Sequence, residues 1–357
     1  MYSKSEKAII FLNMFDFLTI EKRHHILSCF ENAEKLFDDF KDSYETLKNY
    51  ISKNQFDEMC AMLNDEQIDN EIVSLEKDKI KIITCYSNLY PQDFLNYLNF
   101  PLILYCKGDV ELLASFSIAV VGTRKLSRYG ASVTEKLVKG LVNNGVTIIS
   151  GMATGVDTIA HTICLDNNGK TIAVIGSGFN EVYPKTNYAL FNRIVENGLV
   201  ISEYPPSMPA LPQNFPIRNR IIAMLSSGVL MTEAGEKSGA LYTINYAIEY
   251  GKDIFVVPGN IDNFSSVGCN NVLKSCQGAI TTCVDDILSK YNFENKFQKV
   301  QKSAQVTVEE QLILNAIGNG EVFFDEILSQ TKLDTKTLVR LLTNLELNGL
   351  IKKNVGN

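Results

Sequence analysis

The sequence contains no apolar run that approaches the roughly 20 residues of a membrane-spanning helix. Its first residues, Met1 to Lys7, lead into an amphipathic stretch. That stretch lacks the uninterrupted apolar segment and the small-residue cleavage site of a signal peptide. We therefore expect a cytoplasmic protein with no membrane partner.

Closely paired cysteines are also missing. The eight cysteines include no Cys-x-x-Cys motif, the kind of tight ligand pair that a zinc site normally uses. Cys269, Cys276 and Cys283 are spaced by seven residues, but no histidine lies near them in the sequence to complete a ligand set. We expect no metal site, and we predict reduced and mostly buried thiols.

Two phosphate-binding motifs of nucleotide enzymes are absent. The chain has no Gly-x-x-x-x-Gly-Lys-Ser/Thr, which argues against a P-loop NTPase. The turn after Val121 lacks Gly-x-Gly-x-x-Gly, and Gly176-Ser-Gly178 continues as Phe-Asn-Glu without a third glycine. We therefore expect no bound cofactor.

The net charge of −7 would argue against a nucleic-acid partner if it were evenly spread. Residues 1–70 hold 8 Lys and Arg against 14 Asp and Glu, whereas residues 71–290 hold 18 against 19 and residues 291–357 hold 8 against 8. The acidity is thus concentrated in the N-terminal segment. A local basic cleft in the middle of the chain remains compatible with this distribution.

The central part of the chain repeats one pattern every 25 to 30 residues: a short apolar run, a turn rich in glycine and serine, and a helical stretch. Apolar strands that alternate with helices indicate a parallel sheet covered on both faces. We therefore predict an α/β fold with a doubly wound, Rossmann-like core. The predicted strands are Ile118–Val121, Val146–Ile149, Thr171–Ile175, Leu199–Ile201, Val229–Met231 and Ile254–Val257.

Different patterns precede this core. Residues 1–68 carry apolar residues at helical spacing without β-like alternation, which predicts a small helical domain. We assign residues 69–290 to the core and expect residues 69–115 to add an extra strand layer that leads into it.

The last part of the chain is predicted as a separate small domain. Residues 291–306 are polar with few apolar anchors, a composition typical of a linker. Within residues 307–357 we expect helices over Gln311–Ile317 and Phe324–Gln330, and a third that Asp334 caps and that runs to Leu347. A strand beginning at Gly349 would follow. Three helices and a strand indicate a winged-helix-like domain whose wing is shortened.

The residues best suited to bind a ligand lie where the predicted strands end. In an open parallel sheet, ligands bind at the carboxyl ends of the strands, and glycines there let backbone N–H groups approach an anion. Glycines at these positions also serve tight turns in any doubly wound fold, so a purely structural role is the alternative. The candidates at this edge are Gly122, Thr123, Arg124, Ser150, Gly151, Gly176, Gly178, Ser238 and Gly239.

The segment Phe215-Pro-Ile-Arg-Asn-Arg220 is the most informative single stretch. It follows a stiff loop with four prolines between residues 205 and 212. An aromatic ring beside two guanidinium groups offers a stacking face and phosphate donors together, as single-stranded nucleic acid requires. Phe215, Arg218, Asn219 and Arg220 are therefore candidate DNA contacts. The alternative is that Phe215 is a core residue and that the two arginines pair with carboxylates.

Two other features favour structural roles. Asp157 and His161 are four residues apart on a predicted helix, but neither a third group nor a nucleophile is evident, so packing or capping is the favoured interpretation. Lys332, Lys336 and Arg340 recur at four-residue spacing around the third C-terminal helix. They could form a basic stripe or simply a solvated face.

Taken in order, these stretches resemble the DprA/Smf family of DNA-processing proteins. The resemblance covers about residues 85–285 almost continuously, and its motifs are highly specific. The matching stretches are Val121–Arg124, Ser127–Gly130, Ser150–Asp157, Ala160-His161, Tyr183-Pro184 with Asn187, Ile201–Pro205, Phe215–Ile222, Glu233-Ala234, Ser238-Gly239, Val257–Gly259 and Gly268–Asn270.

The resemblance implies a protein without catalytic activity that binds single-stranded DNA, protects incoming DNA and helps to load the RecA recombinase in natural transformation. It implies DNA contacts from Arg124 and from Lys185, the lysine after the Tyr-Pro pair. It also implies a homodimer formed through the Rossmann-like core, a SAM-like or helix-hairpin-helix-like N-terminal domain and a winged-helix-like C-terminal domain. The segment Thr19–Lys22 lacks glycine-rich hairpin turns and lies in acidic sequence, so we assign DNA binding to the core.

Two alternatives stay open. One is a nucleotide phosphoribohydrolase of the lysine-decarboxylase-like (LOG) family, which shares this variant of the Rossmann fold. In that family a glutamate helps to cleave the glycosidic bond, and Thr243 stands at its position here. A hydroxyl group cannot replace a carboxylate in stabilising positive charge on the sugar. The other alternative is a nucleotide-sensing module, which a mononucleotide competition experiment would distinguish.

Overall fold

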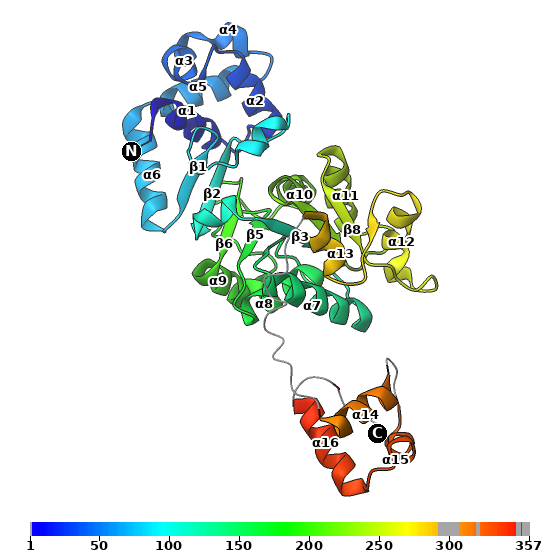
Figure 1. The fold of residues 1–357 in the computed structure, drawn as a ribbon. Helices are drawn as coiled ribbons and strands as arrows, with labels where there is room; N and C mark the ends of the chain where they lie inside the picture. The colour runs from blue at the N-terminus through cyan, green and yellow to red at the C-terminus, as the bar shows by residue number, and fades with distance from the viewer. Residues whose placement is uncertain (1, 292–306, 319–321, 348–350, 352–357) are drawn as a thin grey trace. The chain divides into compact units, whose positions relative to one another are not determined.

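A computed structural model describes residues 2–291, 307–318, 322–347 and 351 (Figure 1). The chain divides into two compact units, the first ending at Glu294 and the second beginning at Asn295. The predicted boundaries after residues 68 and 290 remain predictions. The predicted linker at 291–306 lies outside the described residues apart from Tyr291, and the predicted strand from Gly349 lies outside them apart from Ile351.

The first unit is built on one nine-stranded sheet with the order β1-β2-β6-β5-β4-β3-β7-β8-β9. Pairing is parallel from β6 to β9, whereas β1 pairs antiparallel with β2 and β2 antiparallel with β6. The strands are β1 (Lys81–Thr84), β2 (Ile103–Gly108), β3 (Ser117–Val121), β4 (Thr147–Ser150), β5 (Thr171–Ile175), β6 (Leu199–Ser202), β7 (Gly228–Met231), β8 (Asp253–Val256) and β9 (Ala279–Ile280).

All six predicted core strands are present, so the predicted doubly wound sheet is confirmed. The expected extra layer from residues 69–115 is wrong, because β1 and β2 extend the same sheet at its edge beside β6. Antiparallel strands can join such an edge without the crossover helix that a parallel strand needs. The sheet therefore continues from the parallel core to the N-terminal region.

Helices cover both faces of the sheet (Figure 1). Two separate apolar clusters form, one under α10 and α11 and one under α7 and α8. The helices of the core are α7 (Arg128–Asn143), α8 (Val156–Asp166), α9 (Tyr188–Asn197), α10 (Asn214–Leu225), α11 (Ala240–Glu249), α12 (Val267–Lys274) and α13 (Asp285–Leu288). Short 3-10 turns are η2 (Gln92–Asn96), η3 (Val110–Ala114), η4 (Lys185–Asn187), η5 (Phe264–Ser266) and η6 (Ser289–Tyr291).

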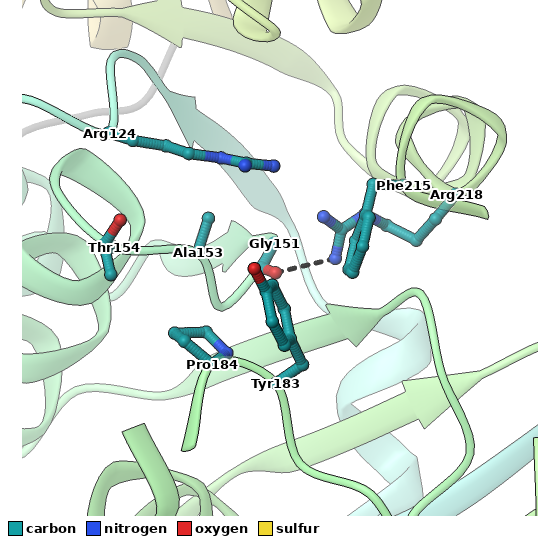
Figure 2. A pocket seen from close by; sticks show the side chains of 8 residues that line it. All are labelled: Arg124, Gly151, Ala153, Thr154, Tyr183, Pro184, Phe215 and Arg218. Carbon is teal, nitrogen blue, oxygen red and sulfur yellow. Dashed lines mark hydrogen bonds between the residues drawn. The ribbon is translucent and has the colours of Figure 1, made fainter. Parts of the chain in front are cut away.

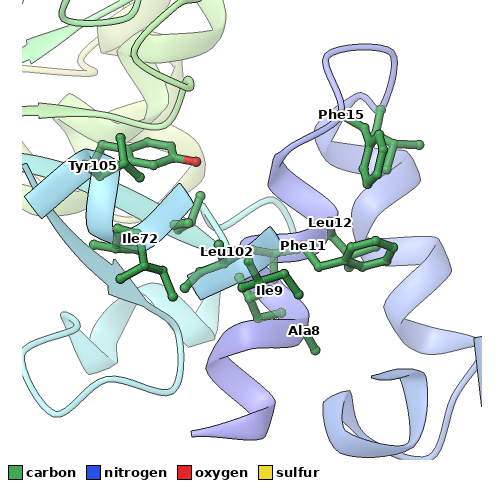
Figure 3. Packing of buried hydrophobic residues seen from close by; sticks show 14 of the residues in the cluster. Ala8, Ile9, Phe11, Leu12, Phe15, Ile72, Leu102 and Tyr105 are labelled. Carbon is green, nitrogen blue, oxygen red and sulfur yellow. The ribbon is translucent and has the colours of Figure 1, made fainter. Parts of the chain in front are cut away.

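The N-terminal region is helical, as predicted, and it packs directly on the sheet. Its helices are α1 (Lys4–Asn13), α2 (Ile20–Ser28), α3 (Ala33–Asp39), η1 (Phe40–Asp42), α4 (Tyr44–Leu47), α5 (Lys53–Met62) and α6 (Asp65–Lys77). Buried side chains of α1, including Ile9 and Phe11, share one cluster with Leu102 and Tyr105 of the strand region (Figure 3). This cluster extends as far along the chain as Val200 in β6.

The second unit contains the three predicted helices, α14 (Val308–Ile317), α15 (Phe324–Thr331) and α16 (Thr335–Leu347). The Asp334 carboxylate accepts the Thr337 N–H at 3.0 Å, which confirms the predicted cap of α16. Lys332 ends α15 in a left-handed conformation and is not part of α16. The predicted basic stripe therefore loses one of its three members.

All eight cysteines are free thiols. Three of them, Cys106, Cys164 and Cys269, are buried, four are half-buried and Cys276 is exposed. The prediction of mostly buried thiols is therefore wrong. Among the described residues, no three His, Cys, Asp or Glu side chains gather closely enough to hold a metal ion. In the same part of the chain no helix is both long and apolar enough to cross a membrane.

Candidate nucleic-acid interface

A cleft lies at the carboxyl ends of the central strands. The chain winds to opposite sides of β3, since β4 and β7 flank it, and such a reversal leaves a crevice at the carboxyl edge of the sheet. The cleft has a volume of about 360 Å³. It is lined by Val121, Gly122, Arg124, Ala153, Asp157, Tyr183, Ala210, Pro212, Phe215, Pro216, Arg218, Asn219, Ile222, Gly239, Ala240, Tyr242 and Thr243.

A smaller hollow of about 50 Å³ adjoins this cleft and shares Arg124, Tyr183, Phe215 and Arg218 with it (Figure 2). The Tyr183 and Phe215 rings lie 5.2 Å apart with a tilt of 39°. The Arg124 guanidinium lies 5.9 Å from the centre of the Phe215 ring. Two aromatic rings and a guanidinium therefore face one hollow, which combines stacking surfaces with positive charge.

Arg124 is exposed, at the turn that follows β3. No hydrogen bond or ion pair engages its guanidinium within the described part of the chain, apart from its approach to Phe215. An exposed guanidinium carries its full charge and can bind a phosphate in a bidentate manner. Of the predicted site residues, Arg124 has the geometry best suited to an anion.

Arg218 supports the floor of the cleft. Its side chain is only 4% exposed, and its Nη1 donates to the carbonyl of Gly151 at 2.7 Å and to the carbonyl of Val174. Burial lowers the pKa of Arg218 to about 10, although the nearby Asp157 carboxylate opposes that shift. The guanidinium joins the ends of β4 and β5 beneath the Arg124 side chain, and it adds positive charge to the cleft.

Arg220 is not brought to the cleft. It is 1% exposed, and its Nη2 donates to both carboxylate oxygens of Glu203 at 2.6 Å. The sequence interpretation treated Phe215–Arg220 as one continuous surface, but these residues belong to α10. Positions 218 and 220 are about 200° apart around a helix, so they face opposite sides. Of the two arginines, Arg220 forms a direct ion pair with a carboxylate, as the alternative predicted, whereas Arg218 interacts with the nearby Asp157 without a direct ion pair.

The predicted glycines and hydroxyl residues divide into two groups. Gly122, Gly151 and Gly239 line the cavities, and Thr123 lies beside them in the β3 turn. The others shape the surrounding loops. Ser150 Oγ donates to the carbonyl of Val120, Ser238 Oγ accepts the N–H of Ala240, Gly176 adjoins the Phe215 ring, and Gly178 packs against the carbonyls of Pro205 and Pro206.

Lys185 is exposed in η4, immediately after the cis Tyr183-Pro184 bond, and is not among the residues lining either cavity. The loop it belongs to is tied to the cleft by Asn187. The Nδ2 of Asn187 donates to the carbonyl of Met152 and to Thr158 Oγ1, both at 2.9 Å. Lys185 therefore lies on a loop that is anchored at the rim of the site.

Sequence reasoning did not assign Tyr183 and Tyr242 to the site. Tyr183 is 48% exposed and Tyr242 is 53% exposed, and both rings line the cleft. The Tyr-Pro motif and the spacing of Tyr242 after Gly239 were the available signals. Aromatic residues at the N-termini of helices that follow parallel strands belong to the ligand-binding edge.

Asp157 and His161 make the packing and backbone contacts that a structural role requires, although Asp157 also lines the cleft. The Asp157 carboxylate accepts the N–H of Ala153 at 3.1 Å. His161 is fully buried with its Nδ1 2.7 Å from Thr171 Oγ1, and burial lowers its pKa to about 3. Thr243, whose position a glutamate would occupy in a phosphoribohydrolase, is 1% exposed in the cleft wall.

Two family models match the chain. The model described as DNA recombination-mediator protein A matches residues 81–292. The model described as the DprA winged helix domain matches residues 298–357. The predicted winged-helix class of the C-terminal domain agrees with the second match.

The chain is similar to proteins from several bacteria. The chain is 42% identical to the DNA processing protein DprA of Streptococcus pneumoniae over 64% of this chain and 80% of that protein. It is 35% identical to the protein Smf of Escherichia coli over 80% of this chain and 79% of that protein.

Two solved structures resemble the fold. The X-ray structure of DNA processing protein A from Streptococcus pneumoniae has a TM-score of 0.69 and 34% identity, covering 81% of this chain and 99% of that one. The second is DNA processing protein A from Helicobacter pylori, described for its single-stranded DNA binding mode. It has a TM-score of 0.54 and 30% identity, covering 59% of this chain and 96% of that one.

Proposed function

This chain belongs to the DNA recombination-mediator protein A (DprA/Smf) family, and we propose that it binds single-stranded DNA in the cleft at the carboxyl ends of β3, β4 and β5. One observation carries this proposal: an exposed Arg124, which pairs with no carboxylate among the described residues, lies over Phe215, which in turn contacts Tyr183. The family likeness to a protein described for single-stranded DNA binding supports it.

In this proposal the phosphates of the strand bind the cations at the rim, Arg124 and Lys185. Unstacked bases lie against the rings of Tyr183 and Phe215, because every base has a π-face and single strands expose it. Duplex DNA stacks its bases internally and cannot use these rings. The preference for single strands over duplex therefore follows from the aromatic pair, and the affinity follows mostly from the cations.

Apart from Tyr183, the proposed DNA contacts are a subset of the residues predicted from sequence. Backbone N–H groups at the glycine turns and the amide of Asn219 complete the polar lining. Arg220, Ser150, Gly176, Gly178 and Ser238 maintain the shape of the site instead of touching DNA. The proposed contacts are Tyr183 together with the sequence-predicted Gly122, Thr123, Arg124, Gly151, Lys185, Phe215, Arg218, Asn219 and Gly239.

The proposed cellular role is protection of incoming single strands and assistance in loading the RecA recombinase, in the cytoplasm and without catalysis. We further propose a homodimer formed through the Rossmann-like core. The family membership supports these assignments, and Thr243 supports the non-catalytic one because its hydroxyl cannot stabilise developing positive charge on a sugar.

The site is tested by DNA-binding titrations with a labelled, unstructured oligonucleotide. We expect Arg124→Ala and Lys185→Ala each to weaken binding roughly tenfold, since a charged hydrogen bond is worth about 1.5–3 kcal/mol. Each loss should also reduce the slope of log K against log salt by about 0.7. Lys139→Ala, an exposed lysine in the middle of α7, is the matched control and should leave binding unchanged.

Two results would count against the proposal. Undiminished DNA binding by the Arg124→Ala, Lys185→Ala double variant would show that the cleft is not the DNA-binding site. Competition by a mononucleotide at concentrations comparable to the oligonucleotide would favour a nucleotide-sensing module. Measuring the affinity of the same variants for single-stranded and for duplex DNA separates the contribution of base stacking from that of charge.

A further inference from the structure

The turn that carries Arg124 is anchored at both ends by one buried residue. Glu233 follows β7 and is 1% exposed. Its backbone carbonyl accepts the N–H of Thr123 at 2.7 Å. Its carboxylate accepts the N–H of Ser127 at 2.8 Å through Oε2 and the Ser127 hydroxyl at 2.5 Å through Oε1. Arg124 lies between these two anchor points.

The carboxylate completes a helix cap that the local sequence leaves unfinished. Ser127 is the N-cap of α7, and its Oγ accepts the N–H of Gly130 at 3.0 Å. In a capping box, a Glu or Gln at that third helical position would reach back to the N–H of the cap. Here the position is glycine, and a Cβ on Gly130 would lie 2.3 Å from Glu233 Oε2. The missing side chain is replaced by the Glu233 carboxylate from the segment that follows β7.

The opposite side of the turn is equally constrained. Gly155 has a φ of 82°, and a Cβ there would lie 2.2 Å from the carbonyl oxygen of Thr123. The same carbonyl accepts the N–H of Val156 at 3.2 Å. The backbone is therefore fixed at Thr123 and at Ser127, and only residues 124 to 126 lie between these two points. The Arg124 backbone is held against the segment that follows β7 on one side and the start of α8 on the other.

We propose that Glu233 is the positioning residue for DNA binding, acting through Ser127 to hold Arg124 over Phe215 before DNA arrives. The proposal rests on the function proposed above. A cation on an ordered turn loses less conformational entropy on binding than one on a loose turn, so preorganisation increases affinity. Glu233 touches neither cavity, and its own negative charge would by itself repel phosphate.

The charge of Glu233 and its positioning role predict opposite effects of Glu233→Gln on DNA affinity. Removing a negative charge close to the cleft should strengthen DNA binding if Glu233 acts only through its charge. Positioning predicts the reverse: binding weakens roughly tenfold, as for a lost charged hydrogen bond. The salt slope should fall by about 0.7, the same change as for Arg124→Ala, because the same phosphate contact is lost.

A double-mutant cycle links the effect to Arg124. If Glu233 acts through Arg124, then Glu233→Gln in the Arg124→Ala background should weaken binding by less than about twofold, because the energies are strongly non-additive. Equal effects in both backgrounds would overturn the inference. If Arg124→Ala alone left binding intact, the proposed DNA site itself would fail, and that result is distinguishable from failure of the cycle.

Thr134→Val provides the matched control for loosened packing. Thr134 is buried between α7 and the segment that follows β7, and its Oγ1 donates to the Gly130 carbonyl at 2.7 Å and lies 2.8 Å from Thr232 Oγ1. It does not touch the turn. We expect it to lower the thermal midpoint at least as much as Glu233→Gln while binding DNA like the wild type. Weakened DNA binding by Thr134→Val would refute a specific role for Glu233.

Discussion

The helices at the two ends of the chain bury their apolar faces in different ways. Those of the N-terminal region share a core with the sheet, in a cluster that runs from Ala8 to Val200. Those of the C-terminal region have a core of their own, whose buried members among the described residues include Ile313, Ile327, Leu338, Leu341 and Leu345. Similar helical composition thus produces one region that is part of the core and another that is a domain by itself.

Hydrogen bonds also join the N-terminal helices to the sheet region. Asn13 at the end of α1 donates through Nδ2 to the Tyr105 hydroxyl at 3.0 Å and to the Glu203 carbonyl at 3.4 Å. His24 in α2 lies 2.8 Å from the carbonyl of Phe100. Buried hydrogen bonds of this kind are costly to break because the separated groups lose their partners. The N-terminal helices are therefore a structural requirement of the sheet edge.

Truncation should produce the largest difference between the two ends. A chain beginning at Ile80 would expose the apolar side chains of β1 and β2 that face α1, so we expect it to lose cooperative unfolding and to aggregate. A chain ending at Tyr291 should keep its near-UV circular dichroism and unfold in one transition. A folded, soluble chain without its first 79 residues would contradict the comparison.

Point substitutions should separate the two cores. Phe11 is 0% exposed and packs edge-on against Phe15 and Phe40, so Phe11→Ala should destabilise the α/β unit by about 3–5 kcal/mol. Leu341→Ala should cost about 2–5 kcal/mol but only in the C-terminal unit. Differential scanning calorimetry should show each variant moving a different transition. Movement of both transitions by either variant would show that the two cores are coupled.

The smallest expected difference is a pH dependence confined to the first unit. Burial holds the pKa of His161 at about 3, whereas an unfolded histidine titrates near 6.5. Below pH 6.5 the unfolded chain therefore binds a proton that the folded chain does not, and stability falls by about 2 kcal/mol at pH 5. Burial lowers the pKa of His24 as well, with the same sign.

The second unit supplies the internal control for that titration. All three histidines of the chain lie at positions 24, 25 and 161. Between pH 7 and pH 5 the C-terminal transition should therefore stay constant while the larger transition moves to lower temperature. Replacing His161 with Gln should flatten the profile of the larger transition. An unchanged profile in that variant would assign the pH dependence to other groups.

Sequence reasoning predicted the strands well because parallel strands covered on both faces are apolar without interruption. Thr171–Ile175 was predicted and observed with the same bounds, and all five of its residues are buried. The packing of the N-terminal helices could not be predicted in this way. It depends on contacts such as the one between Asn13 and Glu203, which are 190 residues apart in sequence, and no local pattern encodes them.

For the candidate site, sequence reasoning predicted the edge of the sheet but not the direction of each side chain. Phe215, Arg218, Asn219 and Ile222 follow the i, i+3, i+4, i+7 pattern of one helical face, and all four line the cleft. Arg220 falls outside that pattern and is buried. No helix was predicted for this segment from its sequence, so the helical period that separates the two arginines was not applied to it.

The shared N-terminal core also sets an order of events during synthesis. Residues that complete the packing around α1, such as Val200 in β6, are translated about 190 residues after α1 itself. At roughly 5–20 residues per second, the ribosome needs roughly 10–40 s to supply them. During that interval Ile9 and Phe11 can pack only against the N-terminal helices and, once they are made, β1 and β2, without the parallel sheet. The emerging chain is therefore a natural client for chaperones early in translation, whereas its last three helices can pack as soon as they leave the ribosome.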